Sequence, residues 1–96
     1  MNYKIRALDF FSKQWKKLDK KSKKIINKKI ELIKENPFRY KRLKSDTPVF
    51  RVRLSIKSKE TRLIYAVVKP DIIIICLLDR KKYYADLNKY LKHIIS

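Results

Sequence analysis

Alternating polar and apolar residues at the start of the chain predict a short, half-buried strand. Over residues 2–8 the side chains of Tyr3, Ile5 and Ala7 alternate with polar ones. Successive side chains of a strand point to opposite faces, so these three residues are expected on the inner side of a sheet.

The spacing of apolar residues then changes to that of helices. Phe11, Trp15 and Leu18 recur at intervals of four and three, which predicts a first helix capped by Asp9. A second helix, with a stripe of isoleucines among many lysines, is predicted to end near residue 35. The two helices form an antiparallel hairpin that needs a sheet to cover its apolar stripe.

Three more strands and a last helix complete the predicted fold. Residues 38–47 are expected to form an irregular basic loop, followed by strands over 50–56, 61–68 and 72–78. The third of these strands is apolar on both faces, which is typical of a central strand. A C-terminal helix is predicted from Asp79. The order β-α-α-β-β-β-α predicts an α+β fold: a small, mostly antiparallel four-stranded sheet with the helical hairpin packed on it.

The charge of the chain indicates an anionic partner. Lys and Arg number 27 against 9 Asp and Glu, giving a net charge of +18 over 96 residues. Repulsion between so many like charges weakens a compact fold unless an anion binds. The length of the chain fits one domain over residues 1–96. Nucleic acid is favoured because tyrosines that stack on bases lie among the cations. A lysine-rich proteome, an anionic membrane surface and an acidic protein are the alternatives.

Several classes of enzyme are poorly supported by the composition. The chain has no glycine, hence neither a P-loop nor a dinucleotide fingerprint. His93 stands alone, so neither a metal site nor a Ser/His/Asp triad is expected, and Cys76 reads as a buried strand residue. The sequence lacks a signal-type apolar segment and any run of the ~18 apolar residues that a membrane span requires. We therefore expect a cytoplasmic protein that needs no membrane, metal or cofactor.

The remaining chemistry is that of cations and a phenol acting on a phosphodiester. Arg51 and Arg53 fall on one face of one strand, and Arg62 on the next strand joins them if the register points it to the same side. Arg80 and Tyr84 are placed to complete the site. Guanidinium groups suit this task because they bind phosphate oxygens through paired hydrogen bonds. The alternative is that strand arginines only keep an open sheet face polar. Four nearby lysines are expected to bind RNA: Lys57, Lys59, Lys81 and Lys82.

Three short segments, in this order and spacing, resemble the RelE/ParE superfamily of toxins from toxin–antitoxin pairs. They are Phe50-Arg51-Val52-Arg53-Leu54, Thr61-Arg62-Leu63-Ile64-Tyr65 and Arg80 to Tyr84. The resemblance implies a metal-independent endoribonuclease that enters the ribosomal A site and cuts mRNA there. It also implies two kinds of partner: the small ribosomal subunit with its mRNA, and a RelB-like antitoxin, expected to be acidic, that wraps the toxin.

The resemblance also implies a role for each matched residue. Arg51 and Arg62 would hold the scissile phosphate, while Arg80, or one of the two lysines after it, would assist the leaving oxygen. Arg53 stands where lysine is common in RelE, and arginine is a poor general base because it does not lose its proton readily. The role of proton acceptor is therefore predicted for Tyr84, assisted by neighbouring cations that favour phenolate; the alternative is that orientation and charge stabilisation provide most of the rate. Two alternatives stay open: the ParE branch, which poisons DNA gyrase, and a basic RNA- or ribosome-binding module without catalysis.

Overall fold

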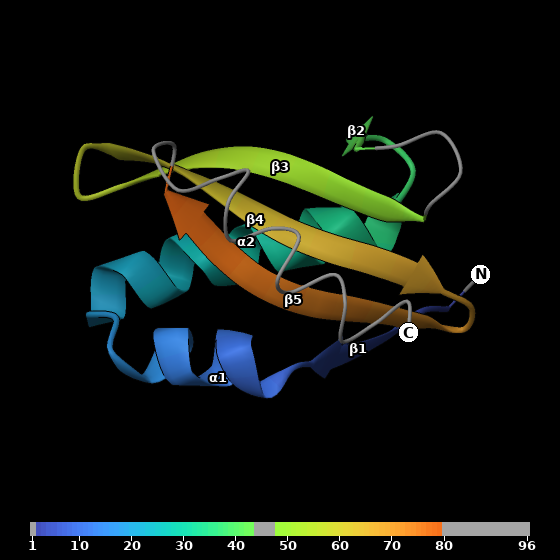
Figure 1. Ribbon diagram of the computed structural model, residues 1–96, viewed down its shortest axis with the longest axis horizontal. Helices are drawn as coiled ribbons and strands as arrows, with labels where there is room; N and C mark the ends of the chain where they lie inside the picture. The colour runs from blue at the N-terminus through green and yellow to red at the C-terminus, as the bar shows by residue number, and fades with distance from the viewer. Residues whose placement is uncertain (1, 44–47, 80–96) are drawn as a thin grey trace.

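The computed structural model describes residues 2–43 and 48–79 of the chain. Within these residues a strand, two helices and four further strands follow one another (Figure 1). Their bounds are β1 (Lys4–Ala7), α1 (Asp9–Lys16), α2 (Lys20–Glu35), β2 (Lys41–Arg42), β3 (Val49–Ile56), β4 (Lys59–Val68) and β5 (Asp71–Asp79). The predicted α+β class is confirmed. Asp79, expected to begin the last helix, is instead the final residue of β5, and the rest of that predicted helix lies outside the described residues.

The described part of the sheet has five strands, in the order β1-β5-β4-β3-β2. β1 runs parallel to β5, and the other neighbouring pairs are antiparallel. The prediction of four strands was wrong, because β2 pairs with β3 inside the segment expected to be a loop. A strand of two residues is too short for alternation to reveal it. Ala7, predicted to face inward, is exposed on the edge strand β1.

The two helices form the predicted antiparallel hairpin, on one side of the sheet (Figure 1). The N-cap of α1 is Leu8 rather than Asp9. Asp9 lies in the first turn, where its negative charge interacts favourably with the positive end of the helix dipole. Asp19 caps α2, its side chain accepting a hydrogen bond from the backbone N–H of Ser22 at 3.3 Å. This hydrogen bonding, with the charge of Lys57 in addition, lowers the pKa of Asp19. A second helix therefore begins immediately after the break between the two.

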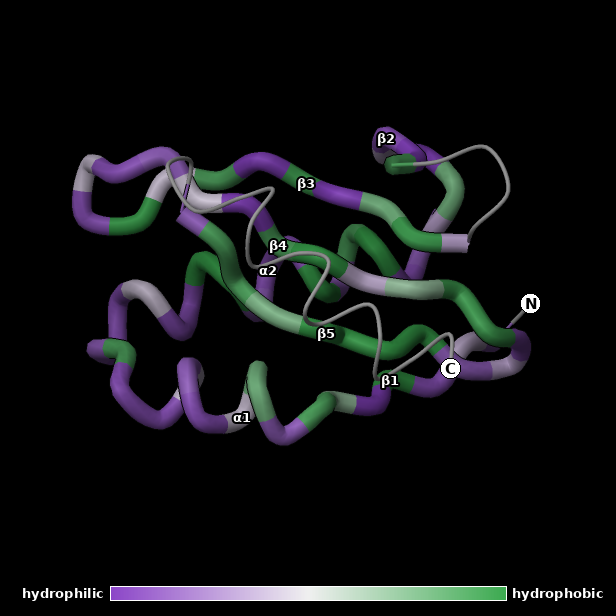
Figure 2. The backbone as a smooth tube through the Cα atoms, viewed as in Figure 1, coloured by the Kyte–Doolittle hydropathy of each residue, from purple (hydrophilic) through white to green (hydrophobic). Residues whose placement is uncertain are grey.

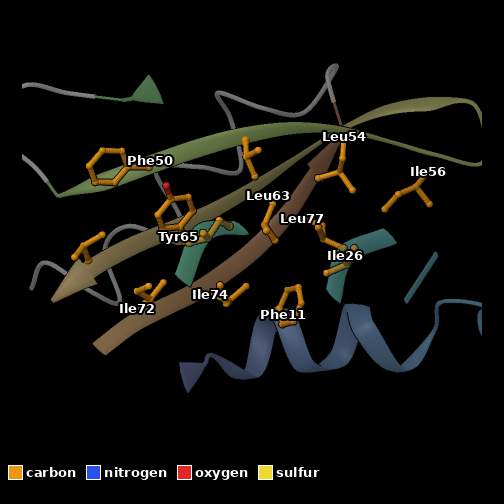
Figure 3. Close-up of a cluster of buried hydrophobic side chains, with 13 residues drawn as sticks. Phe11, Ile26, Phe50, Leu54, Ile56, Leu63, Tyr65, Ile72, Ile74 and Leu77 are labelled. Carbon is orange, nitrogen blue, oxygen red and sulfur yellow. The ribbon is translucent and has the colours of Figure 1, made fainter. Parts of the chain in front are cut away.

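The main core lies between the helices and the sheet. Phe11 from α1 and Ile26 and Ile33 from α2 pack against the inward side chains of the strands (Figure 3). The strand residues of this cluster are Phe50, Val52, Leu54, Ile56, Leu63, Tyr65, Val67, Ile72, Ile74 and Leu77. Burial of each large side chain of this kind contributes ~1.5–3 kcal/mol relative to exposure, so the cluster fixes which face of each strand meets the helices.

A second buried apolar cluster lies on the opposite face of the sheet. It consists of Val49, Ile64, Ala66, Ile75, Cys76 and Leu78. Figure 2 shows that β5 is hydrophobic over most of its length, between an aspartate at each end. The prediction that Cys76 is a buried strand residue is confirmed. β5 lies between β1 and β4 and is covered on both faces, as its unbroken apolar sequence indicated.

A β-bulge in β5 lets both of its ends contribute to the helix-side core. Tyr65 pairs with Ile74, whereas Ile64 pairs with Cys76, so Ile75 is the extra residue. In a regular strand, Ile74 and Leu77 would point to opposite faces because they are three residues apart. With the bulge, both belong to the helix-side cluster.

Gln14 of α1 takes the place of a strand beside the last part of β5. The ladder from β1 reaches only as far as Ile74, whose carbonyl accepts from Leu8 N at 3.0 Å. Further along, the Gln14 side chain donates to the carbonyl of Leu77 at 2.8 Å and accepts from the Leu77 N–H at 2.7 Å. One amide thus satisfies both backbone groups of a residue that β1 does not reach.

The hairpin between β3 and β4 turns without glycine. Lys57 and Ser58 are its two turn residues, with φ of 51° and 65°, and Ile56 pairs with Lys59 across them. Two positive φ angles are the mark of a type I′ turn, for which Asn-Gly is the favoured sequence. A residue with a Cβ pays ~1 kcal/mol or more to adopt such a conformation.

Candidate nucleic-acid interface

The register of β3 and β4 brings three of the predicted site residues onto one face. Arg53 lies directly opposite Arg62, and Arg51 is two residues from Arg53 on the same side of β3. This is the sheet face opposite the helices, because the intervening Val52 and Leu54 belong to the helix-side core. The condition on which Arg62 depended, a register that points it to the side of the other two, is met.

Lys41 extends this face and was missed by the sequence analysis. It lies directly opposite Arg51 in the pairing of β2 with β3, so the two side chains share a face. Two residues later Leu43 joins the apolar cluster of the same face, in keeping with the alternation of a strand. This alternation could have predicted the position of Lys41, but it covers too few residues to identify a strand before its pairing is known.

A single carboxylate lies among these cations in the described part of the chain. Glu60 Oε1 is 3.8 Å from Arg53 Nε and 3.8 Å from Arg62 Nη2. Its position on β4, opposite Ser55, puts it on the arginine face. The sequence analysis also missed Glu60, because the sequence alone does not show which residues lie opposite it on the neighbouring strand. We call Lys41, Arg51, Arg53, Glu60 and Arg62 the arginine face.

The two opposed arginines differ in exposure. The Arg53 side chain is 62% exposed, whereas that of Arg62 is 9% exposed and that of Glu60 36%. Arg62 is flanked by Arg53 on one neighbouring strand and by the buried Leu78 on the other. A guanidinium group remains positively charged inside proteins. The face therefore combines one fixed, nearly enclosed cation with one that reaches into solvent.

Lys57 and Lys59 lie apart from the arginine face. Lys59 pairs with Ile56, whose side chain is in the helix-side core. Both lysines line a cavity of about 350 Å³ between the hairpin and α1, together with Gln14, Lys17, Leu18, Ile56, Thr61 and Leu77. The structure thus divides the predicted set between two sides of the sheet, and RNA binding by these lysines stays a prediction.

The remaining predicted residues are Arg80, Lys81, Lys82 and Tyr84, and all four lie outside the described residues. His93 does as well. Their roles stay predictions.

Tyr65, in one of the segments that carry the resemblance, belongs to the core. Its hydroxyl donates to the carbonyl of Pro37 at 2.6 Å, and its ring stacks on Phe50 at 5.4 Å between centroids. Burial, with a smaller contribution from Tyr40, raises the pKa of Tyr65 well above its ordinary value. This tyrosine therefore ties β4 to the segment after α2 and points away from the arginine face.

Two further searches of the described residues gave no site. Over 2–43 and 48–79, no three His, Cys, Asp or Glu side chains are grouped so as to hold a metal ion. Neither described helix has the length and apolar composition needed to cross a membrane.

The fold and this face define a small α+β protein that presents a row of cations on one side of a mixed sheet. No protein-family model matches the sequence, and no curated protein is significantly similar to it. Solved structures do match. The chain is similar to a double mutant of the E. coli toxin RelE in the free state, with a TM-score of 0.79, 21% identity and coverage of 98% of this chain and 99% of that one.

Two complexes that contain related toxins also match. The intact E. coli RelBE toxin–antitoxin complex gives a TM-score of 0.67 at 18% identity, covering 82% of this chain and 96% of the other. The archaeal RelE–RelB complex from Pyrococcus horikoshii gives 0.55 at 18% identity, covering 83% and 97%. The chain therefore has the fold of the RelE toxins, and the predicted resemblance is confirmed at the level of the fold.

Proposed function

We propose that this protein, over residues 1–96, is the toxin of a type II toxin–antitoxin pair. In this proposal it is a cytoplasmic endoribonuclease that enters the ribosome and cuts mRNA in the A site without a metal or cofactor. The observation that carries the proposal is the cross-strand pairing of Arg53 with Arg62, with Arg51 on the same face. The likeness to solved RelE structures supports the toxin class.

The energetics of the arginine face support an anionic ligand. Its two cross-strand pairs, Lys41 with Arg51 and Arg53 with Arg62, are both cation opposite cation. Like charges directly opposite one another destabilise a sheet, by an amount comparable to the ~0.2–1 kcal/mol that a favourable pair contributes. Glu60, 3.8 Å from both Arg53 and Arg62, offsets part of this repulsion. A phosphodiester bound to the cations of this face supplies a negative charge that offsets their repulsion and accepts their hydrogen bonds.

The proposed reaction uses the nucleophile of the RNA itself. The 2′-OH attacks the neighbouring phosphorus, and the phosphate gains negative charge in the transition state. Arg51 and Arg62 hold the phosphate oxygens, and the Arg62 side chain is almost fully buried. Positioning of this kind accelerates the reaction because the charges need no reorganisation during the step. Arg80, Lys81 or Lys82 assists the departing 5′ oxygen, as predicted from the sequence.

An antitoxin is the second partner in this proposal. The net charge of +18 favours an acidic protein segment that folds as it binds. Two of the similar structures are complexes of RelE with RelB, one bacterial and one archaeal. Such a segment would also mask the cations of the arginine face from RNA.

The test is to map the 5′ ends of mRNA after the protein is induced in cells. Cuts within the codon held in the A site are expected with the unaltered protein and not with Arg62→Ala. Because Arg62 is buried, Arg53→Ala serves as a second variant, since its exposed side chain adds little packing. Arg39→Ala, an exposed arginine of the segment between α2 and β2, is the matched control and should cut normally.

Two other results would contradict the proposal. Intact mRNA together with a loss of DNA supercoiling would indicate gyrase inhibition. Intact mRNA with ribosome binding that weakens steeply with salt and only gradually as arginines are removed would indicate a basic binding module.

A further inference from the structure

An exposed aromatic ring lies beside β2, at the edge of the sheet. Phe38 is 47% exposed, and Val68 is the other large apolar side chain that is exposed within residues 2–43 and 48–79. Single exposed apolar side chains are common on protein surfaces, so the exposure alone indicates nothing. What distinguishes Phe38 is the way its ring is held and the charge that accompanies it.

Hydrogen bonds fix the backbone that presents this ring. The N–H of Phe38 donates to Asn36 Oδ1 at 3.3 Å, and the N–H of Arg39 donates to the backbone carbonyl of Asn36 at 3.2 Å. The carbonyl of Pro37 accepts from the Tyr65 hydroxyl at 2.6 Å. A turn tied at three points holds the ring in place before a ligand arrives, which reduces the entropy lost on binding.

The ring is also the outer end of a row of aromatic side chains. Phe38 meets Phe50 in a T-shaped arrangement, with 5.8 Å between centroids and 75° between planes. Phe50 in turn stacks on Tyr65, at 5.4 Å (Figure 3). Phe38 is therefore supported by the core while about half of its surface stays open to solvent.

A cation accompanies the exposed ring. Lys69 Nζ, from the turn between β4 and β5, lies 5.7 Å from the centroid of Phe38. The neighbouring Arg39 lies over Tyr40 instead, at 6.0 Å, and is not assigned to this site. Proteins that bind single-stranded nucleic acid combine an aromatic face, on which a base stacks, with cations that follow the phosphate backbone.

The pairing of β2 with β3 puts Phe38 next to the arginine face. Arg42 lies opposite Phe50, which Phe38 contacts. The next pair along the two strands is Lys41 with Arg51, both of the arginine face. An RNA strand that is bound at Arg51 and leaves the face across β2 therefore passes Phe38.

We propose that Phe38 is a stacking platform for a base of the single-stranded message, with Lys69 on a neighbouring phosphate. The choice of the message rests on the proposed function, to which this inference adds a contact outside the arginine face. A protein partner fits the site less well, because a stable protein interface buries about 800 Å² on each partner. A base needs only one ring.

The experiment measures the Kd of a fluorescently labelled uridine oligomer for the full chain over a range of salt concentrations. Phe38→Leu keeps an apolar side chain against Phe50 but removes the aromatic face, so the Kd should rise roughly 5- to 150-fold, the range for one lost base stack. The slope of log Kd against log salt should not change, because no phosphate contact is lost. Phe38→Trp should restore binding, and RNA should quench the fluorescence of the new indole.

Matched controls separate stacking from charge. Inorganic polyphosphate has phosphates but no bases, so it should bind Phe38→Leu as tightly as the unaltered protein. Lys69→Gln should lower the salt slope by about 0.7, the value for one phosphate of a single strand. Lys13→Gln, the same change on an exposed position of α1, should leave the slope unchanged.

Cross-linking on programmed ribosomes tests the choice of the message. Thiouridine placed in the message and activated by light should attach to the peptide that contains Phe38, and the attachment should be lost in Phe38→Leu. If the message is cut but that peptide is not attached to it, the inference is wrong and the proposed function stands.

The binding measurements give two further results that would overturn the inference. One is an unchanged Kd of the uridine oligomer for Phe38→Leu. The other is an equal loss of oligomer and polyphosphate binding, which would indicate a general loss of charge or of the folded state. If the unaltered protein binds the oligomer through Phe38 but cuts no mRNA, the proposed function fails while the stacking contact stands.

Discussion

Replacement of Gln14 by alanine tests whether a helix side chain holds the free edge of β5. The substitution removes two hydrogen bonds, of 2.8 and 2.7 Å, to the backbone of Leu77. Each is worth ~1 kcal/mol net, and more where the groups left behind are hidden from water. Leu77 is only 8% exposed, so water replaces the lost partner poorly. Alanine recovers a few tenths of a kcal/mol of helix propensity. The expected loss in the free energy of unfolding is therefore about 2 kcal/mol.

The assay is urea denaturation followed by the fluorescence of Trp15, the chain's single tryptophan, which lies on the same helix. The midpoint should fall while the slope stays unchanged, and the thermal midpoint should fall by roughly 8–16 °C for a chain of this size. Lys13→Ala, on an exposed position of α1, is the matched control and should stay within about 0.5 kcal/mol. A loss below about 0.5 kcal/mol for Gln14→Ala would refute the reasoning, because water would then satisfy Leu77 equally well.

Three further substitutions test the turn, the core tyrosine and the helix cap. Ser58→Gly should raise the free energy of unfolding by roughly 0.5–1 kcal/mol, because glycine adopts the observed φ of 65° without a Cβ clash; an unchanged urea midpoint would contradict this. Tyr65→Phe should cost ~1–2 kcal/mol by leaving the Pro37 carbonyl without its 2.6 Å donor. Burial raises the pKa of Tyr65, so the contribution of the neutral phenol to stability is complete below the ordinary tyrosine pKa of ~10 and is lost as the pH rises above it. In that range the free energy of unfolding should therefore fall more steeply with pH for the unaltered protein than for Tyr65→Phe. Equal slopes would contradict the raised pKa. Asp19→Ala should lower the thermal midpoint, and since hydrogen bonding with Ser22 lowers the pKa of Asp19, the difference from the unaltered protein should disappear as the pH falls through that lowered pKa; a difference that persists at low pH would contradict the cap.

The candidate site was only partly predictable from sequence. Arg51 and Arg53 share a face because residues two apart on a regular strand do so, and periodicity was sufficient to predict it. That Arg62 joins them depended on the turn, since a hairpin with one residue more or fewer would shift the register and send Arg62 to the other face. The two-residue turn at Lys57 and Ser58 settles that register.

Lys41 and Glu60 illustrate the opposite case. No sequence pattern distinguishes either residue. Lys41 lies beside the arginines because β2 pairs with β3, and Glu60 because β4 pairs with β3. Lys57 and Lys59 are close to the arginines in sequence yet face the helix-side cavity. Closeness in sequence did not predict closeness in space at the tip of the hairpin, because residues only a few positions apart there point to different faces of the sheet.

The sequence by itself determined the α+β class, the helical hairpin, the buried β5 and the concentration of positive charge, because periodicity and composition are local properties of the chain. The tertiary structure alone decided the fifth strand, the bulge at Ile75, the contact of Gln14 with Leu77 and the position of Glu60 between two arginines. Each of these depends on which strands are neighbours and in what register. That choice is made by burying two apolar clusters on a single sheet, and no short segment contains the information.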